Sequence, residues 1–145
     1  MLKVEFDEID RVDDAAFRYA VIVSRFQGRY IYCKHKERDT WEIPGGRREP
    51  EEAILDTAGR ELFEETGAKD FKLYPVCAYA VVRQGEEKSY GLLCFADIRE
   101  LGKLPDSEIE RTGLFETEPE NLTYPEIQPL LFQKVRQHLN KIFPR

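Results

Sequence analysis

Apolar and polar positions divide the chain into a series of β-strands, with one helix in the middle and one near the end. Residues 17–25 and 29–34 are rich in β-branched and aromatic side chains, and Gln27-Gly28 between them predicts a hairpin. A second strand pair is predicted around the polar turn at residues 84–87. The predicted strands are residues 17–25, 29–34, 41–43, 71–83, 88–97 and 112–116.

Two segments have the period of an amphipathic helix. From Ile54 to Thr66, Ile54, Ala58 and Leu62 fall on one face at about 100° per residue. Pro125 predicts the start of a last helix. Its apolar stripe would consist of Ile127, Leu130, Leu131, Val135, Leu139 and Ile142. The order β-β-β-α-β-β-β-α predicts an α+β sandwich, and the length of 145 residues predicts a single domain, residues 1–145.

The first predicted helix has an unusual inward face, because its apolar stripe becomes acidic. Glu61 and Glu65 continue the line of Ala58, and Glu64 stands beside them at i, i+3, i+4 spacing. Carboxylates directed at a core are rarely left unpaired. A hard divalent cation with oxygen ligands would favour this arrangement. The alternative is a solvated acidic helix face.

These glutamates belong to a longer motif, Gly46, five residues, Glu52, seven residues, and then Arg60-Glu61-Leu62-Phe63-Glu64-Glu65-Thr66-Gly67-Ala68. The motif resembles the signature box of the Nudix hydrolases, and every polar position of the box is present. Ala68 is the one departure, since the family usually has a bulkier aliphatic residue there. The preceding segment, residues 41–46, also resembles the strand and loop that lead into the box.

The resemblance implies an α/β/α sandwich around a mixed sheet and hydrolysis of a nucleoside diphosphate linked to another moiety. Mg²⁺ or Mn²⁺ is the implied cofactor. The implied metal ligands are Glu61, Glu64 and Glu65, with a carbonyl at Gly45 or Gly46. Catalytic roles fall to Glu52, Arg60 and Glu64. Arg60 would orient the glutamates, and Glu52 would be a base or a further metal ligand.

Elementary chemistry supports the same cofactor. A diphosphate bridge is anionic, so charge opposes attack by hydroxide, and divalent ions reduce that opposition. Ligands that are all oxygen suit Mg²⁺ or Mn²⁺ rather than zinc. For Glu52 to reach the cluster it must lie in the loop, with the helix starting near Ala53 or Ile54. If Glu52 were part of the helix, it would stand nine residues before Glu61 and therefore on the opposite face.

Four residues that are not among the fixed positions of the box are weaker candidates. Arg38 is predicted to contact substrate phosphates, against the alternative of a solvated turn. Trp41 is a candidate to stack on a base, although core or rim packing is the stronger interpretation. Arg47 would bind a substrate phosphate or offset the negative charge of the box. Glu108, in a polar loop before the last strand, would bring a further carboxylate to the metal, or it would be a solvated charge.

Composition excludes several functional classes. A net charge of −6 argues against nonspecific binding of nucleic acid. It does not exclude the small nucleotide that the resemblance implies as partner, because a metal ion can supply the positive charge. There is no apolar stretch of membrane length, and the three cysteines lack a CxxC pair. We therefore expect a cytoplasmic protein with reduced Cys33, Cys77 and Cys94. A homodimer is left open.

The leading functional hypothesis is metal-dependent hydrolysis of a nucleoside triphosphate or an oxidised dNTP to a monophosphate and pyrophosphate. Nucleotide sugars, dinucleoside polyphosphates and RNA 5′ ends are alternative substrates, because the box indicates the reaction rather than the leaving group. Two other classes are a non-catalytic nucleotide sensor, which would typically lack box glutamates, and an isoprenoid diphosphate isomerase, which would need a catalytic cysteine.

Overall fold

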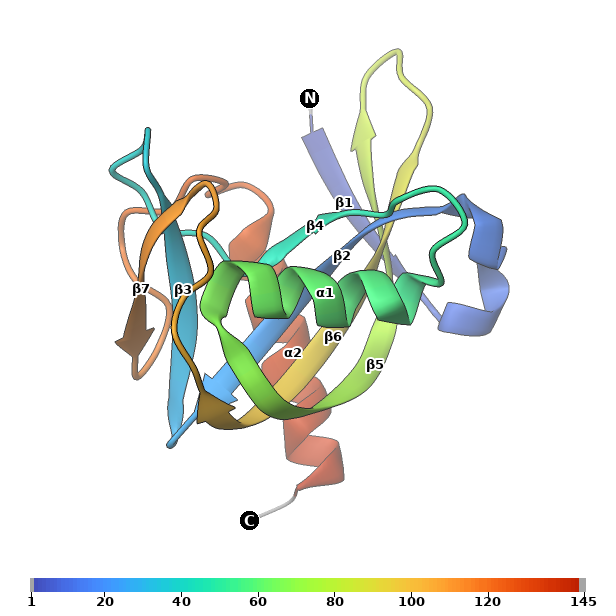
Figure 1. The fold of residues 1–145 in the computed structure, drawn as a ribbon. Coiled ribbons are helices and arrows are strands. Elements are labelled where there is room, and N and C mark those ends of the chain that lie inside the picture. Colours follow the sequence, from blue (N-terminus) through green and yellow to red (C-terminus); the bar gives the residue numbers. More distant parts are fainter. Residues whose placement is uncertain (1, 144–145) are drawn as a thin grey trace.

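A computed structural model describes residues 2–143 as a seven-stranded mixed sheet with a helix on each face (Figure 1). Two short 3-10 turns, Ile9–Arg11 and Asp14–Ala16, precede the second strand. The strands are β1 (Leu2–Asp7), β2 (Phe17–Phe26), β3 (Arg29–His35), β4 (Gly45–Arg47), β5 (Ala68–Arg83), β6 (Ser89–Leu101) and β7 (Ile109–Phe115), and the helices are α1 (Ile54–Thr66) and α2 (Gln128–Ile142). The predicted α+β sandwich is confirmed.

The sheet has the order β1-β5-β6-β2-β3-β7, and the short strand β4 pairs with β2 away from this path. β2 and β6 run parallel at the centre, and the remaining neighbours are antiparallel. β6 is buried on both faces, as expected for a central strand covered by helices. Its residues alternate, with Leu92 and Cys94 on one side and Leu93 and Phe95 on the other.

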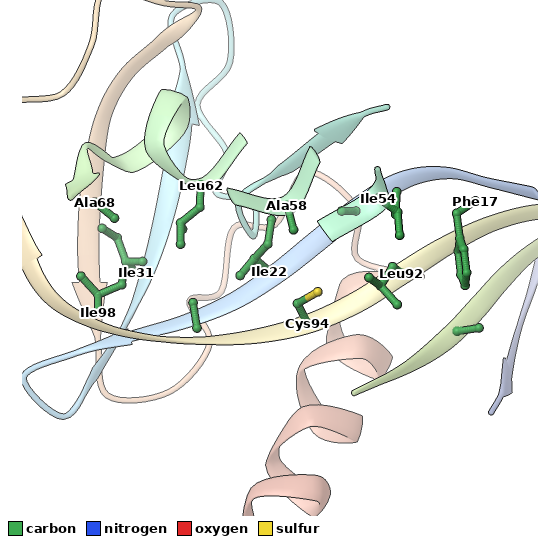
Figure 2. Packing of buried hydrophobic residues seen from close by; sticks show 13 residues of the cluster. Phe17, Ile22, Ile31, Ile54, Ala58, Leu62, Ala68, Leu92, Cys94 and Ile98 are labelled. Carbon is green, nitrogen blue, oxygen red and sulfur yellow. The ribbon is translucent and has the colours of Figure 1, made fainter. Parts of the chain in front are cut away.

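Each face of the sheet therefore has its own core. On the α1 face, Ile54, Ala58 and Leu62 pack onto Ile22 and Cys94 of the central strands (Figure 2). On the α2 face, the helix contributes a second set of buried side chains, Leu131, Phe132, Val135 and Leu139. The apolar half of the α1 stripe thus fixes the helix on the sheet, which determines where the acidic half lies.

Helix α1 starts at Ile54, as predicted, and Glu52 lies in the preceding loop. The helix ends at Gly67, whose φ of 79° is left-handed and whose N–H donates to the Phe63 carbonyl at 2.8 Å. At Gly59 an added Cβ would meet Leu73 at an ordinary 3.8 Å. Close packing on the sheet therefore does not require a glycine at position 59.

Some predictions about the elements were wrong. β1 was not predicted, although Leu2, Val4 and Phe6 alternate with charged residues in the way a half-buried strand requires. Residues 41–43 do not form a strand, because they make single bridges to two different segments, Cys33 to Glu42 and Trp41 to Leu122. The glycines that follow form β4 instead.

The last helix also differs from the prediction. α2 begins at Gln128 rather than Pro125, since residues 125–127 form a turn before it. Leu130, placed in the apolar stripe, is 44% exposed, and Phe132 is buried in its place. The side chain of Ile142 lies outside the described residues. Within residues 2–143, neither helix has the length and apolarity that crossing a bilayer demands.

Candidate active site

Arg60 of α1 is the centre of the box. Its Nε and Nη2 atoms contact the two oxygens of Glu52 at 2.7 Å and 3.0 Å. Nη1 lies 2.8 Å from Glu61 Oε1 and 3.2 Å from Glu64 Oε2, the latter an i, i+4 pair. Nη2 also donates to the Arg47 carbonyl at 2.9 Å. One guanidinium thus connects three glutamates of the motif to β4.

Glu52 is held on all sides by these contacts. Besides Arg60, the Thr57 hydroxyl donates to Glu52 Oε1 at 2.6 Å, and the Glu49 N–H donates to it at 3.1 Å. Hydrogen bonds from Arg60, then from Thr57, lower the pKa of Glu52 to about 2. Such a carboxylate is a weak proton acceptor, and its geometry suits it to fixing Arg60.

Glu65, one helical turn beyond Glu61, is in the opposite situation. Its Oε1 accepts the Gly45 N–H at 2.9 Å and lies 3.8 Å from the Cys33 thiol. Among residues 2–143, no basic side chain forms an ion pair with it. Burial, with a smaller contribution from the charge of Glu61, raises the pKa of Glu65 to about 8. Burial also raises the pKa of Glu61, although the neighbouring Arg60 lowers it in part.

The glycine pair brings β4 close to both neighbouring elements. A Cβ on Gly46 would overlap the Glu61 carboxylate, and a Cβ on Gly45 would meet the backbone oxygen of Ala20 on β2. Only glycine permits this approach, and the predicted carbonyl ligands at Gly45 and Gly46 therefore lie beside the acidic end of α1.

These residues fit a divalent cation in their chemistry. Glu61, Glu64, Glu65 and the nearby carbonyls all offer oxygen ligands, and the half-buried Glu65 has no ion-pair partner among residues 2–143. Within the described part of the chain, no three His, Cys, Asp or Glu side chains already stand in a metal-binding arrangement. Glu61 and Glu64 are paired with Arg60 instead, at 2.8 Å and 3.2 Å.

A pocket of about 420 Å³ lies on the α2 face of the sheet, behind β4. Its walls include the Tyr19 and Tyr79 rings, whose centroids are 5.7 Å apart, together with Tyr124 and Arg47. Aromatic walls with a few polar groups are typical of sites for small organic ligands. The sequence suggests Tyr79 for a base pocket only as a weaker alternative to core packing. The rest of the pocket was not predicted, because its residues come from five strands and helices and the β5–β6 hairpin, namely β2, β4, β5, β6 and the start of α2.

One backbone segment, residues 43–47, separates this pocket from the carboxylates. On the pocket side the Ile43 N–H donates to Gln128 Oε1 at 2.8 Å, and Gln128 lines the pocket. On the other side the Gly45 N–H donates to Glu65. Arg47 contacts both sides of the segment, since it lines the pocket while its carbonyl accepts a hydrogen bond from Arg60.

The structure places the weaker candidates as follows. Arg38 lies 3.0 Å from the carboxylate of Glu42, a buried residue that the sequence analysis did not single out. The Trp41 ring packs edge-on against Phe115 at 5.1 Å. Glu108 is a solvent-exposed loop residue whose carboxylate lies 3.9 Å from His35 Nδ1. In the sequence, the only indication of Glu42 is that an acidic residue stands between two apolar ones.

Comparison with known proteins identifies the family of the chain. The NUDIX domain model matches residues 16–133. YtkD of Bacillus subtilis strain 168, provisionally named an 8-oxo-dGTP diphosphatase, is 37% identical over 117 residues, which are 77% of this chain and 72% of that protein. The crystal structure of the Bacillus subtilis pyrophosphohydrolase BsRppH superposes with a TM-score of 0.77 at 27% identity, over 94% of this chain and 90% of that one.

A Caenorhabditis elegans Ap4A hydrolase shares the fold, with a TM-score of 0.65 at 19% identity over 86% of this chain and 99% of the other. The fold and the box together define a diphosphate-cleaving hydrolase. The chain belongs to the Nudix family and is a pyrophosphohydrolase of that family.

Proposed function

We propose that this protein hydrolyses nucleoside triphosphates to a monophosphate and pyrophosphate, with an oxidised dNTP such as 8-oxo-dGTP as the leading substrate. The supporting observation is the shared wall, residues 43–47, between the tyrosine-lined pocket and the carboxylates. A nucleoside in the pocket directs its phosphates to this wall. The similarity to YtkD supports the oxidised guanine nucleotide.

In this proposal Glu61, Glu64 and Glu65, with a carbonyl at Gly45 or Gly46, hold Mg²⁺ or Mn²⁺. Such an ion would neutralise phosphate charge and lower the pKa of an attacking water. Arg60 keeps Glu61 and Glu64 in position, and Glu52 keeps Arg60 in position. Arg47, at the edge of the pocket, binds the phosphate next to the nucleoside.

On the pocket side, Tyr19 and Tyr79 accommodate the base. The Tyr19 hydroxyl donates to the Ser89 carbonyl at 2.9 Å, so its ring is fixed before a ligand arrives. The aromatic surface supplies stacking and apolar contact, which every base can use. Base preference would then come from polar groups at the rim rather than from the rings.

The test is release of phosphate and pyrophosphate from dNTPs, 8-oxo-dGTP, ADP-ribose, nucleotide sugars, diadenosine polyphosphates and 5′-triphosphate RNA. Each substrate is assayed with Mg²⁺, Mn²⁺ or EDTA. We expect metal-dependent pyrophosphate release, fastest with 8-oxo-dGTP. The matched variants are Glu65→Gln and Glu100→Gln, since Glu100 is an exposed residue of β6. Only Glu65→Gln should lose activity.

Two outcomes would change the proposal. Binding of nucleotides without any turnover would favour a sensor. If only 5′-triphosphate RNA were cleaved, the proposed substrate class would change from free nucleotides to RNA 5′ ends, and the proposed reaction would stay the same. The second outcome has some support, because an RNA pyrophosphohydrolase of a Psychrobacter species is 35% identical over 66 residues, which are 44% of this chain and 35% of that protein.

A further inference from the structure

Glu42 is a buried carboxylate to which the proposed reaction gives no role. It is 7% exposed and stands directly before the wall segment. Its backbone is fixed by a pair of hydrogen bonds with Cys33 of β3, each 2.9 Å long. The Cys33 thiol in turn lies 3.4 Å from the Glu42 carbonyl and 3.8 Å from Glu65 Oε1. Glu42 is therefore a near neighbour of the carboxylate cluster.

Both carboxylate oxygens of Glu42 have a nitrogen partner. Oε1 lies 2.8 Å from His35 Nε2, and Oε2 lies 3.0 Å from Arg38 Nη1. With both oxygens engaged, the carboxylate cannot rotate without losing a contact. Buried ion pairs are seldom more stabilising than apolar residues of the same size. Net stability is thus a poor explanation for Glu42, and orientation of its partners is a better one.

Arg38 is the partner that can reach a ligand. Its side chain is 44% exposed, and a guanidinium has five N–H donors, most of which Glu42 leaves free. The segment that carries Arg38 is bonded to the residue before Tyr124, because the Thr40 and Thr123 hydroxyls are 2.6 Å apart and the Thr123 N–H donates to the Trp41 carbonyl at 2.9 Å. Tyr124 lines the nucleoside pocket. Arg38 itself lines a second hollow, together with His35 and Glu108, and therefore stands at the outer rim of the nucleoside pocket rather than in its wall.

We propose that Glu42 is a positioning residue that holds the Arg38 guanidinium at the rim, so that its free N–H groups bind the phosphate chain of a nucleotide. His35 completes the arrangement by holding the second oxygen of Glu42. A lysine at position 38 would not replace the arginine, because it lacks the planar fork that meets two phosphate oxygens at once. The inference rests on the proposed function for its ligand, a nucleoside polyphosphate.

The experiment is a double-mutant cycle with Glu42→Gln, Arg38→Ala and the combination of both. KM and kcat for dGTP are measured with Mg²⁺, and the Kd for dGTP is measured by calorimetry in EDTA. We expect each single variant to raise KM and Kd about 10-fold with kcat nearly unchanged, as loss of a contact made equally in ground and transition states would. The double variant should be no weaker than Arg38→Ala alone, because Glu42 acts through Arg38.

Three further variants complete the design. Glu37→Gln removes the same charge from an exposed neighbour and should behave as wild type. Arg38→Lys should weaken binding despite its charge. Glu42→Asp, which keeps the charge but shortens the side chain, substitutes for Glu42→Gln if that variant does not fold, and it should weaken binding as well.

The possible failures can be distinguished. An unchanged Kd and KM in Glu42→Gln, or effects that add in the double variant, would overturn the role of Glu42. If the wild type binds dGTP but cleaves nothing, the proposed function fails, and the Kd cycle in EDTA still decides the inference. If the wild type neither binds nor cleaves dGTP or 8-oxo-dGTP, both are overturned.

Discussion

Glu52 and Glu65 belong to one motif, yet their surroundings give them opposite properties. The loop carboxylate, Glu52, has a guanidinium along both of its oxygens, and its pKa falls to about 2. The helix carboxylate, Glu65, is partly buried against Gly45 and Cys33 with no ion-pair partner in the described part of the chain, and its pKa rises to about 8. The motif thus combines a glutamate that is already neutralised with one that still lacks a counter-charge.

The difference teaches that position in a motif does not define a role. Arg60 satisfies one end of the carboxylate cluster and leaves the other end open. We interpret the satisfied end as the support and the open end as the place for an external cation. The following predictions separate these two roles.

The largest effect is expected at the open end. Glu65→Gln should lower kcat roughly 100-fold or more, since it removes a ligand of the required ion. In EDTA the same variant should be at least as stable as the wild type, because a partly buried carboxylate near Glu61 is lost. Steady-state kinetics and thermal melts measure the two quantities. A clear loss of metal-free stability would indicate a structural role.

The support end should respond in the opposite way. Glu52→Gln should lower kcat by about 10- to 100-fold, as removal of an orienting partner does, and it should also lower the melting temperature in EDTA. An amide cannot match the double contact that Glu52 makes with Arg60. If Glu52→Gln melted at the wild-type temperature while losing all activity, Glu52 would be a base or a ligand instead.

The pH dependence of stability should also distinguish the two residues. In EDTA, folded Glu65 binds its proton more tightly than the unfolded chain does, so stability should fall as pH rises from about 4.5 to about 8. For Glu52 the sign is reversed, and its contribution should be lost as pH falls from about 4.5 towards 2. Urea unfolding across this pH range measures both contributions. Glu65→Gln should make the free energy of unfolding less dependent on pH near neutrality.

The smallest effect is expected at Gly59, on the same helix but away from both carboxylates. Gly59→Ala should raise the free energy of unfolding by up to about 1 kcal/mol, because the new Cβ meets Leu73 only at ordinary contact distance. Activity should not change. Gly67→Ala is the contrasting variant, and it should destabilise the protein, since φ is 79° and the Cβ would lie 2.8 Å from the Gly102 carbonyl. Thermal melts of both variants provide the comparison.

The sequence predicted best where local chemistry decides the structure. The start of α1, the loop position of Glu52 and the contact between Arg60 and Glu64 all depend on residues a few positions apart. The strands of the central hairpin follow from β-rich runs around a turn. The assignment of the box residues to metal and catalysis remains a prediction.

What the sequence did not predict depends on contacts between distant segments. The strand expected at residues 41–43 is absent because Trp41 and Glu42 bridge to segments on opposite sides. The pocket needs Tyr19, Tyr79 and Tyr124, which are brought together only by the order of strands in the sheet. The contacts of Glu42 with His35 and Arg38 likewise form only after Glu42 pairs with Cys33 of β3.

The thin wall at residues 43–47 has a consequence for how such proteins diverge. The residues that would perform the chemistry are in one continuous stretch of the gene, whereas the pocket walls are encoded in several distant stretches. Substitutions at Tyr19, Tyr79 or Tyr124 can therefore accumulate without disturbing Arg60 and its glutamates. A lineage can acquire a new nucleotide while inheriting the hydrolytic step intact, so a well-preserved box is a poor guide to what a given descendant consumes.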